Sequence, residues 1–309
     1  MRVNMRGIQD GVWPVMITPF TEDNKIDYNQ VLKLLEWYEK QKVAGVFAVC
    51  QSSEMFFLTK EERYELAKFI SGHAPKNMGV VASGHVAATV EEQAEDAKAI
   101  IDAGVDSYVF ISNQFAKKNE SEDAAKRGIE RLLDRIPAES FGIYECPFPY
   151  KRVLSPELLK FCADTGKFSF LKDTCCDLVQ LKEKAEAVKG TDLKIYNANA
   201  ATLLESLRMG CAGYSGVMAN FHADLYVWLC ENYTKSPERA EQMQNFLGAA
   251  SLMECQVYPV NAKYHMQLEG LNISTHCRTR DAAELTKNKQ MEVEQFRAME
   301  QVFRENFFR

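Results

Sequence analysis

Short apolar segments alternate with longer stretches of helical periodicity along most of this chain. The apolar segments are bounded by glycine, proline and polar residues, and their starts are spaced about 20 to 35 residues apart, which is typical of repeated βα units. We therefore expect eight strands, at residues 12–18, 45–50, 78–83, 107–111, 141–146, 169–172, 193–196 and 213–217.

The stretches between these segments carry helix signals. Residues 27–42 place apolar side chains on one face at helical spacing. Thr59 and Glu62 form a capping box ahead of a helix that reaches about residue 72. A third helix is predicted from Thr89 to Ala103, with Gly104 as its C-terminal stop. Four further helices are predicted near the end of the chain, at residues 222–233, 237–254, 259–269 and 288–306.

This alternation predicts an α/β fold, a (β/α)8 TIM barrel with a C-terminal helical extension. Residues 1–220 are expected to form the catalytic barrel, and residues 221–309 a helical extension packed on it as a single structural unit. No linker rich in proline, glycine or serine separates the two parts. An open doubly wound sheet is the alternative, disfavoured because no expected strand leads into a glycine-rich dinucleotide-binding turn.

Composition narrows the functional classes. The net charge is −6 and basic residues are scattered, so no nucleic-acid partner is expected. The sequence has no apolar stretch of membrane-spanning length and no signal-peptide pattern, so we expect a cytoplasmic protein without a membrane partner. Five histidines and nine cysteines show no metal-ligand spacing, so no metal is expected. The cysteines should be mostly reduced, with Cys175 a packing residue.

Candidate chemistry is concentrated at two strand ends. Lys172 ends the sixth expected strand, and Tyr144, 28 residues earlier, lies near the end of the fifth. Side chains at these ends converge in a barrel, where desolvation lowers a lysine pKa and makes the amine a nucleophile toward carbonyl carbon. Alternatively, Lys172 pairs with Asp173 and Tyr144 is a buried aromatic with one hydrogen bond. Because neighbouring side chains on a strand point to opposite faces, a pocket-facing Lys172 should not pair with Asp173.

The second strand ends in a polar segment, Cys50-Gln-Ser-Ser-Glu54. Ser52 and Ser53 either cap the following turn or provide a hydroxyl relay to Tyr144 and donors for a substrate carboxylate. Glu54 is expected to stabilise the loop and not to act as an acid catalyst.

At these motifs the chain resembles the pyruvate-dependent class I aldolases and lyases that include dihydrodipicolinate synthase and N-acetylneuraminate lyase. The resemblance covers about residues 11–220, and the helical tail also fits. Residues 50–54 stand where the family has a glycine, two hydroxyl residues, glycine and glutamate. Residues 144–147 stand where it has tyrosine, asparagine, an apolar residue and proline, and residues 171–174 match its lysine strand.

The resemblance implies a Schiff-base-forming lyase that cleaves or forms a carbon–carbon bond between pyruvate and an aldehyde. Lys172 would form a covalent imine with C2 of the 2-oxo acid, so no separate cofactor is expected. Tyr144 would shuttle protons, with Ser52 in the relay. A homo-oligomer, tetramer or dimer, is also implied. The residues expected to bind substrate are Gln51, Ser53, Asn197, Ala198, Asn199 and Ser215.

Four departures bear on the substrate. Gln51 occupies the first hydroxyl position of the strand-2 motif, and Phe115 falls near the tyrosine that synthases borrow from a neighbouring subunit. Pro149 replaces the carboxylate-binding arginine of the synthases, with Lys151 or Arg152 as candidate substitutes out of register. Residues 196–201 also lack the acidic pair of the sialic acid lyases.

These departures favour a 2-oxo-3-deoxy sugar acid or a related hydroxy-oxo acid as substrate. Dihydrodipicolinate synthase or N-acetylneuraminate lyase activity proper is one alternative. An imine-dependent dehydratase of a deoxy-oxo sugar acid is another. A non-catalytic barrel that binds a 2-oxo acid is the alternative from outside the enzymes.

Overall fold

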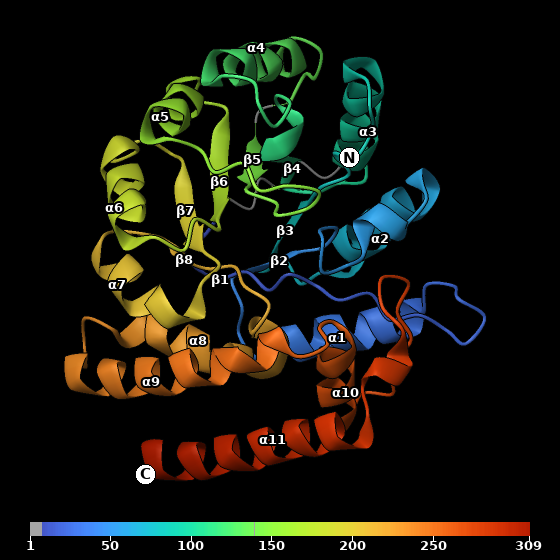
Figure 1. Ribbon diagram of the computed structural model, residues 1–309, viewed down its shortest axis with the longest axis vertical. Helices are drawn as coiled ribbons and strands as arrows, with labels where there is room; N and C mark the ends of the chain where they lie inside the picture. The colour runs from blue at the N-terminus through green and yellow to red at the C-terminus, as the bar shows by residue number, and fades with distance from the viewer. Residues whose placement is uncertain (1–7, 139) are drawn as a thin grey trace.

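In the computed structural model, which describes residues 8–138 and 140–309, the strands close into a barrel (Figure 1). The strands pair in parallel, in the order β1-β8-β7-β6-β5-β4-β3-β2. A parallel bridge between Val15 and Phe47 completes the ring. The strands are β1 (Gly11–Val12), β2 (Gly45–Phe47), β3 (Gly79–Ala82), β4 (Ser107–Ile111), β5 (Phe141–Tyr144), β6 (Phe168–Asp173), β7 (Lys194–Asn197) and β8 (Gly213–Tyr214).

A helix follows each strand and packs on the outside of the ring (Figure 1). The predicted (β/α)8 TIM barrel is confirmed. The open doubly wound sheet is excluded because the segment that directly follows β1 is joined to β2 by hydrogen bonds such as Phe47 N to Pro14 O at 2.8 Å. The barrel helices are α1 (Tyr28–Lys40), α2 (Lys60–His73), α3 (Val90–Asp102), α4 (Glu122–Leu133), α5 (Pro156–Asp164), α6 (Leu178–Ala187), α7 (Leu203–Arg208) and α8 (Ala219–Asn232).

The helix starts follow from local capping chemistry. Thr59 and Thr89 each accept a hydrogen bond from the third helical residue, Glu62 and Glu92, whose carboxylates bond back to the cap. Within residues 8–138 and 140–309, each helix is too short or too polar to cross a membrane.

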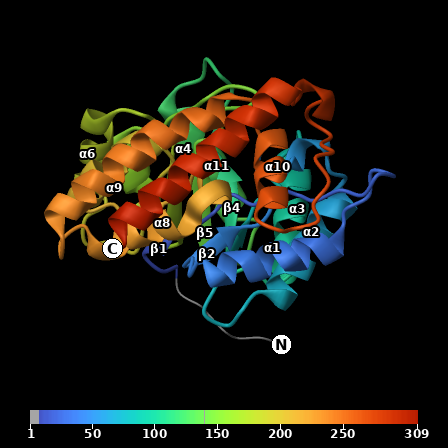
Figure 2. The same cartoon turned by 90° about the horizontal axis from the view of Figure 1, so that it is seen from below.

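The C-terminal extension consists of α9 (Pro237–Ala250), a short 3-10 helix η4 (Ser251–Cys255), α10 (Val260–Leu268) and α11 (Lys287–Phe307). Both views place α9 and α11 side by side, on the α8 side of the barrel (Figures 1 and 2). Phe246 of α9 stacks on Phe303 of α11 with ring centroids 4.1 Å apart. The expected boundary at residue 220 falls inside α8, because the chain passes from β8 almost directly into its eighth barrel helix.

Aromatic rings fill the interior of the barrel below the site. Trp13 packs edge-on against Phe170 at 5.6 Å, and Phe47 packs edge-on against Phe170 at 6.1 Å. Glycine is required beside Trp13, because a Cβ on Gly45 or Gly79 would lie 2.2 or 2.4 Å from its indole ring. This packed floor leaves the carboxyl ends of the strands as the part of the barrel that can hold a ligand.

Candidate active site

Lys172 and Tyr144 meet at the carboxyl ends of β6 and β5. The two residues are register partners in neighbouring parallel strands. The Nζ atom of Lys172 lies 4.3 Å from the centroid of the Tyr144 ring. Both side chains are 4% exposed. The pair predicted from strand-end positions is therefore brought together in a pocket shielded from water.

Burial controls the ionisation of both groups. It lowers the pKa of the Lys172 amine, against opposing effects from Cys50, Cys146 and Glu254. An ordinary lysine is neutral in only about one molecule in a few thousand at pH 7, so a lowered pKa increases the nucleophilic fraction. Burial raises the pKa of Tyr144 well above its usual value, so the phenol remains a proton donor.

Gln51 accepts a hydrogen bond from the Tyr144 hydroxyl. Tyr144 donates to Gln51 Oε1 at 3.3 Å, and the Cys146 thiol lies 3.4 Å from the same oxygen. Gln51 occupies the position where the family's strand-2 motif has its first hydroxyl residue. In its contact with Tyr144, Gln51 acts only as a hydrogen-bond acceptor. A carboxamide oxygen has no proton to pass on, so Gln51 can orient Tyr144 but cannot extend a hydroxyl relay.

The two serines of the strand-2 loop have different roles. The Ser53 hydroxyl accepts from Cys50 N at 2.6 Å and donates to Cys50 O at 2.8 Å, which closes the turn. Ser52 partly offsets the rise in the Tyr258 pKa caused by burial, so its hydroxyl lies near the Tyr258 hydroxyl. The backbone amides of Ser52 and Ser53 point toward the Cys50 thiol.

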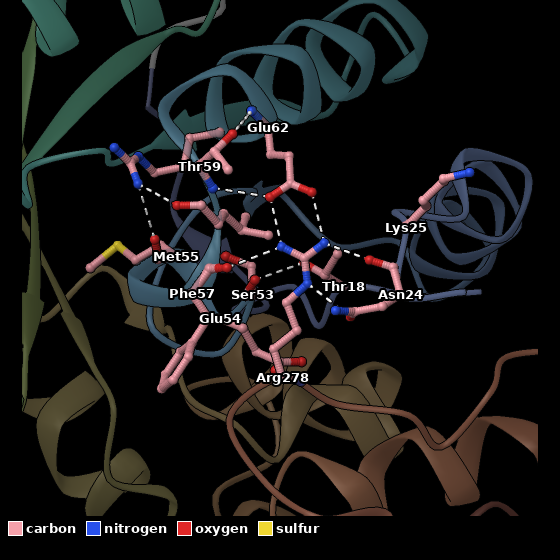
Figure 3. Close-up of polar contacts among 12 residues, drawn as sticks. Thr18, Asn24, Lys25, Ser53, Glu54, Met55, Phe57, Thr59, Glu62 and Arg278 are labelled. Atoms are coloured by element: carbon pink, nitrogen blue, oxygen red, sulfur yellow. Dashed lines mark hydrogen bonds and ion pairs between the residues drawn. The ribbon is translucent and has the colours of Figure 1, made fainter. Parts of the chain in front are cut away.

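Glu54 ties this loop to the C-terminal extension (Figure 3). Its buried carboxylate pairs with Lys263 of α10 at 3.1 Å and accepts from the backbone amides of Arg278 and Thr279 at 2.6 and 2.8 Å. The Arg278 guanidinium in turn binds both carboxylate oxygens of Glu62, at 2.6 and 2.7 Å. Glu54 is thus a structural anchor, as its sequence position suggested.

A buried ionic triad holds the strands that carry the reactive pair. Glu145 and Asp173, which directly follow Tyr144 and Lys172, both bind Lys184 of α6, at 2.5 and 2.6 Å. Burial and the neighbouring Asp173 raise the pKa of Glu145 to about 7, against the opposing effect of Lys184. Asp173 therefore points away from Lys172, which confirms the expected alternation of side chains along β6.

The expected distal residues fall into two groups. Asn197 bonds Thr202 Oγ1 at 3.0 Å and accepts from the Asn199 amide at 2.8 Å, so its side chain closes the turn after β7. The Asn199 side chain likewise accepts from the Ala201 amide. Ala198 offers only a methyl group, and its amide donates to Asp173 O. Ser215 is buried, with no hydrogen-bond partner for its hydroxyl among the described residues.

The residues suggested as substitutes for the missing arginine are engaged elsewhere. Lys151 Nζ donates to Thr174 O at 2.6 Å, and Arg152 donates to the carbonyl oxygens of Lys117 and Glu120. Phe115 is buried in its own chain, with its ring 5.7 Å from that of Phe110.

Sequence reasoning missed two residues contributed by the extension, Tyr258 and Glu254. The segment 237–254 was expected to be one helix, but it ends at Ala250 and continues as η4. Glu254 acts electrostatically on Lys172, 82 residues earlier in the chain. No local sequence pattern predicts that Glu254 lies near Lys172, although Pro259 indicates a break in the helical pattern nearby.

The nine cysteines are free in the structure. Cys175 is partly buried against the core, while Cys176 is exposed. In the described part of the chain, His, Cys, Asp and Glu side chains form no group of three or more that could hold a metal ion.

A closed barrel that buries a lysine beside a tyrosine at its strand ends defines the class: a lyase of the class I aldolase type. The chain belongs to the dihydrodipicolinate synthetase family, whose model matches residues 9–299. The resemblance inferred from the motifs is therefore confirmed.

Individual relatives are distant. The 4-hydroxy-tetrahydrodipicolinate synthase of Clostridium perfringens (strain ATCC 13124) is 26% identical over 259 residues, 83% of this chain and 87% of that protein. YagE, a prophage protein of the dihydrodipicolinic acid synthase family from E. coli K12, was solved in complex with pyruvate. It is 22% identical, with a TM-score of 0.82 over 93% of this chain and 98% of that chain. The sialic acid aldolase of Ruminococcus gnavus is 18% identical, with a TM-score of 0.84 over 96% and 99%. The structural likenesses support the barrel fold.

Proposed function

We propose that this protein is a Schiff-base aldolase that cleaves or forms a bond between pyruvate and an aldehyde, acting on a 2-oxo-3-deoxy sugar acid or a related hydroxy-oxo acid. The observation that carries the proposal is the buried Lys172 amine 4.3 Å from the Tyr144 ring. Family membership and the pyruvate complex of YagE support pyruvate as the common product or substrate.

In the cleavage direction, the neutral Lys172 amine attacks C2 of the 2-oxo acid, and water leaves to give a protonated imine. A base removes the proton of the C4 hydroxyl, the C3–C4 bond breaks, and its electron pair moves into the imine to give an enamine and an aldehyde. Protonation at C3 and hydrolysis then release pyruvate and regenerate the amine. The synthetic direction reverses these steps.

Tyr144 is the group placed to exchange this proton. In the resting enzyme its raised pKa keeps it protonated. Imine formation places a fixed cation beside the ring, which favours the phenolate and equips Tyr144 to accept the C4 proton. Because its hydroxyl bonds a carboxamide at Gln51, the proton passes directly between Tyr144 and substrate.

The strand-2 loop is the proposed site for the substrate carboxylate. The Ser53 hydroxyl is used within the turn, so the backbone amides of Ser52 and Ser53 and the Ser52 hydroxyl are the donors we assign to it. Gln51 borders this position through its contact with Tyr144. Ser215 is the residue beyond β8 that we assign to the distal part of the substrate.

The test is pyruvate release from a panel of 2-oxo-3-deoxy sugar acids, followed with a coupled lactate dehydrogenase assay. We expect activity from the native enzyme, none above background from Lys172→Ala, and a fall of about 10²–10⁴-fold in kcat for Tyr144→Phe. A product that has lost water without free pyruvate would identify a dehydratase instead. Binding of 2-oxo acids without turnover of any panel member would support the non-catalytic alternative.

We also propose that the chain acts as a homo-oligomer, tetramer or dimer, in the cytoplasm. The family resemblance and the exposed apolar residues on α11, Met291, Met299 and Val302, support self-association. The nine free cysteines favour a reducing compartment. Light scattering coupled to gel filtration tests the assembly, and a monomer at micromolar concentration would overturn it.

A further inference from the structure

The C-terminal extension holds the strand-2 loop through the carboxylate of Glu54, which is 1% exposed (Figure 3). Glu54 Oε1 accepts from Lys263 Nζ at 3.1 Å, and Oε2 accepts from the backbone amides of Arg278 and Thr279 at 2.6 and 2.8 Å. Lys263 is fully buried and also donates to His276 O at 2.6 Å. One side chain and two backbone amides of the extension therefore converge on a single carboxylate of the barrel.

Arg278 fixes the 276–279 segment of the extension against the barrel (Figure 3). Its guanidinium binds both carboxylate oxygens of Glu62 and donates to Phe57 O at 3.0 Å and to Asn24 O at 2.7 Å. These contacts reach α2, the end of the strand-2 loop and the loop between β1 and α1. The two backbone amides that bind Glu54 are therefore held in place by the Arg278 side chain.

The backbone of Glu54 has an unusual conformation. Its φ of +65° and ψ of +32° lie in the left-handed region, which residues other than glycine rarely adopt. Such a conformation persists where the surrounding contacts enforce it. The Glu54 amide donates to Gln51 O at 3.0 Å, and Thr18 Oγ1 donates to Ser53 O at 2.8 Å. The shape of the turn at residues 51–54 therefore depends on how Glu54 is held.

The amides of Ser52 and Ser53 lie inside this turn, which is the proposed site for the substrate carboxylate. No backbone or side-chain oxygen in residues 8–138 and 140–309 accepts from either amide, and both point toward the Cys50 thiol, a weak acceptor. Two adjacent amides without an oxygen acceptor suit a carboxylate ligand. Their direction is set by the turn, so the contacts of Glu54 bear on how well they meet that ligand.

We propose that Lys263 and Arg278 are positioning residues that act through Glu54 to align the carboxylate-binding amides of the strand-2 loop. This inference rests on the proposed aldolase function and deepens it, because it makes the C-terminal extension part of the machinery that recognises the 2-oxo acid. Loss of either side chain should weaken recognition of the substrate carboxylate while the Lys172 amine can still form an imine.

The experiment compares two carbonyl compounds within each variant. One is pyruvate, and the other is pyruvamide, in which an uncharged carboxamide replaces the carboxylate. Each is incubated with the protein and sodium cyanoborohydride, and intact-mass and peptide mass spectrometry follow the rate at which the reduced adduct forms on Lys172. The measured quantity is the ratio of the pyruvate rate to the pyruvamide rate, with both compounds below saturation.

The ratio is measured in the native protein, in Arg278→Ala, in Lys263→Met and in the control Arg280→Ala. Arg280 is an exposed cation two positions after Arg278, and its side chain pairs with Glu284 of the extension at 3.0 Å. Lys263→Met leaves the Glu54 carboxylate buried without a cation, which is strongly destabilising. Arg278 is only partly buried, so Arg278→Ala tests the proposal even if Lys263→Met does not fold.

We expect the native protein and Arg280→Ala to react faster with pyruvate than with pyruvamide. Arg278→Ala and Lys263→Met should lower that ratio by about 10- to 100-fold, because small displacements of binding groups have effects of this size. A purely structural role would reduce both rates equally, since partial unfolding cancels in the ratio.

An unchanged ratio in Arg278→Ala, or an equal fall in Arg280→Ala, would overturn the positioning role and leave the aldolase proposal intact. A native ratio near one, with an adduct on Lys172, would show that the loop does not recognise the carboxylate and would also overturn this inference. If neither compound forms an adduct with the native protein, the proposed function fails, and this inference fails with it.

Discussion

Replacing Lys184 by methionine should destabilise the protein far more than an ordinary surface substitution. Lys184 is fully buried and binds Glu145 at 2.5 Å and Asp173 at 2.6 Å, on the two strands that carry the reactive pair. Methionine fills much of the volume but leaves two carboxylates buried without a cation. Removing one partner of a buried ion pair costs about 3–5 kcal/mol. This is a large share of the free energy of unfolding of a typical folded protein, about 5–15 kcal/mol.

The loss should depend on pH. The pKa of Glu145 is raised from 4.5 to about 7 on folding, so the stability this group contributes is complete below about pH 4.5 and is lost as pH rises through 7. Because Lys184 lowers the pKa of Glu145, its removal raises that pKa further. At pH 5 Glu145 is protonated and only Asp173 loses its cation, so we expect a loss of about 3 kcal/mol there and about 5 kcal/mol at pH 8.

Urea unfolding followed by circular dichroism at pH 5 and pH 8 measures both values. Lys182→Met, an exposed lysine on the same helix, serves as the matched control and should cost less than about 0.5 kcal/mol. The triple variant Glu145→Gln, Asp173→Asn, Lys184→Met should recover much of the loss, since it replaces a broken ionic network with neutral groups. A loss under 1 kcal/mol at pH 8, or an equal loss at both pH values, would refute the reasoning.

Three further outcomes follow from the contacts. Tyr144→Phe should still form a borohydride-trapped pyruvate adduct but turn over about 10²–10⁴-fold more slowly, and loss of the adduct would show that the hydroxyl is already needed to form the imine. Gly45→Ala should cost about 1–3 kcal/mol in urea unfolding, because its Cβ would lie 2.2 Å from Trp13; an unchanged midpoint would contradict this packing. Burial alone would raise the pKa of Glu300, but His222 and neighbouring charges hold it at about 2, so its stabilisation is present above pH 4.5 and lost toward pH 2. Glu300→Gln should therefore reduce, by about 3 kcal/mol, the free energy of unfolding that is lost between pH 4.5 and pH 2. An unchanged dependence of stability on pH in this range would argue against it.

The barrel could be predicted because its signals are local. Each strand is an apolar run. Helices such as α2 and α3 begin at capping boxes, which involve only the four residues from the N-cap to the third helical residue. Lys172 and Tyr144 could be paired for the same reason, since residues at the ends of consecutive strands become neighbours in a parallel sheet.

The remaining parts of the site depend on contacts between residues far apart in the chain. Glu54 binds Lys263, which lies 209 positions later in the chain, and no sequence pattern near either residue indicates this pairing. Glu254 depends on where η4 lies over the barrel, which local periodicity does not determine. Asn197 was expected to face substrate, but its short amide side chain bonds its own turn, as asparagine often does after a strand.

The central claim is that Lys172 forms an imine with a 2-oxo acid. Incubation with pyruvate and sodium borohydride, followed by intact-mass and peptide mass spectrometry, tests it directly. The predicted result is a single reduced pyruvyl adduct on Lys172 that is absent from Lys172→Ala. An adduct confined to another lysine, or no adduct on folded protein at saturating pyruvate, would contradict it.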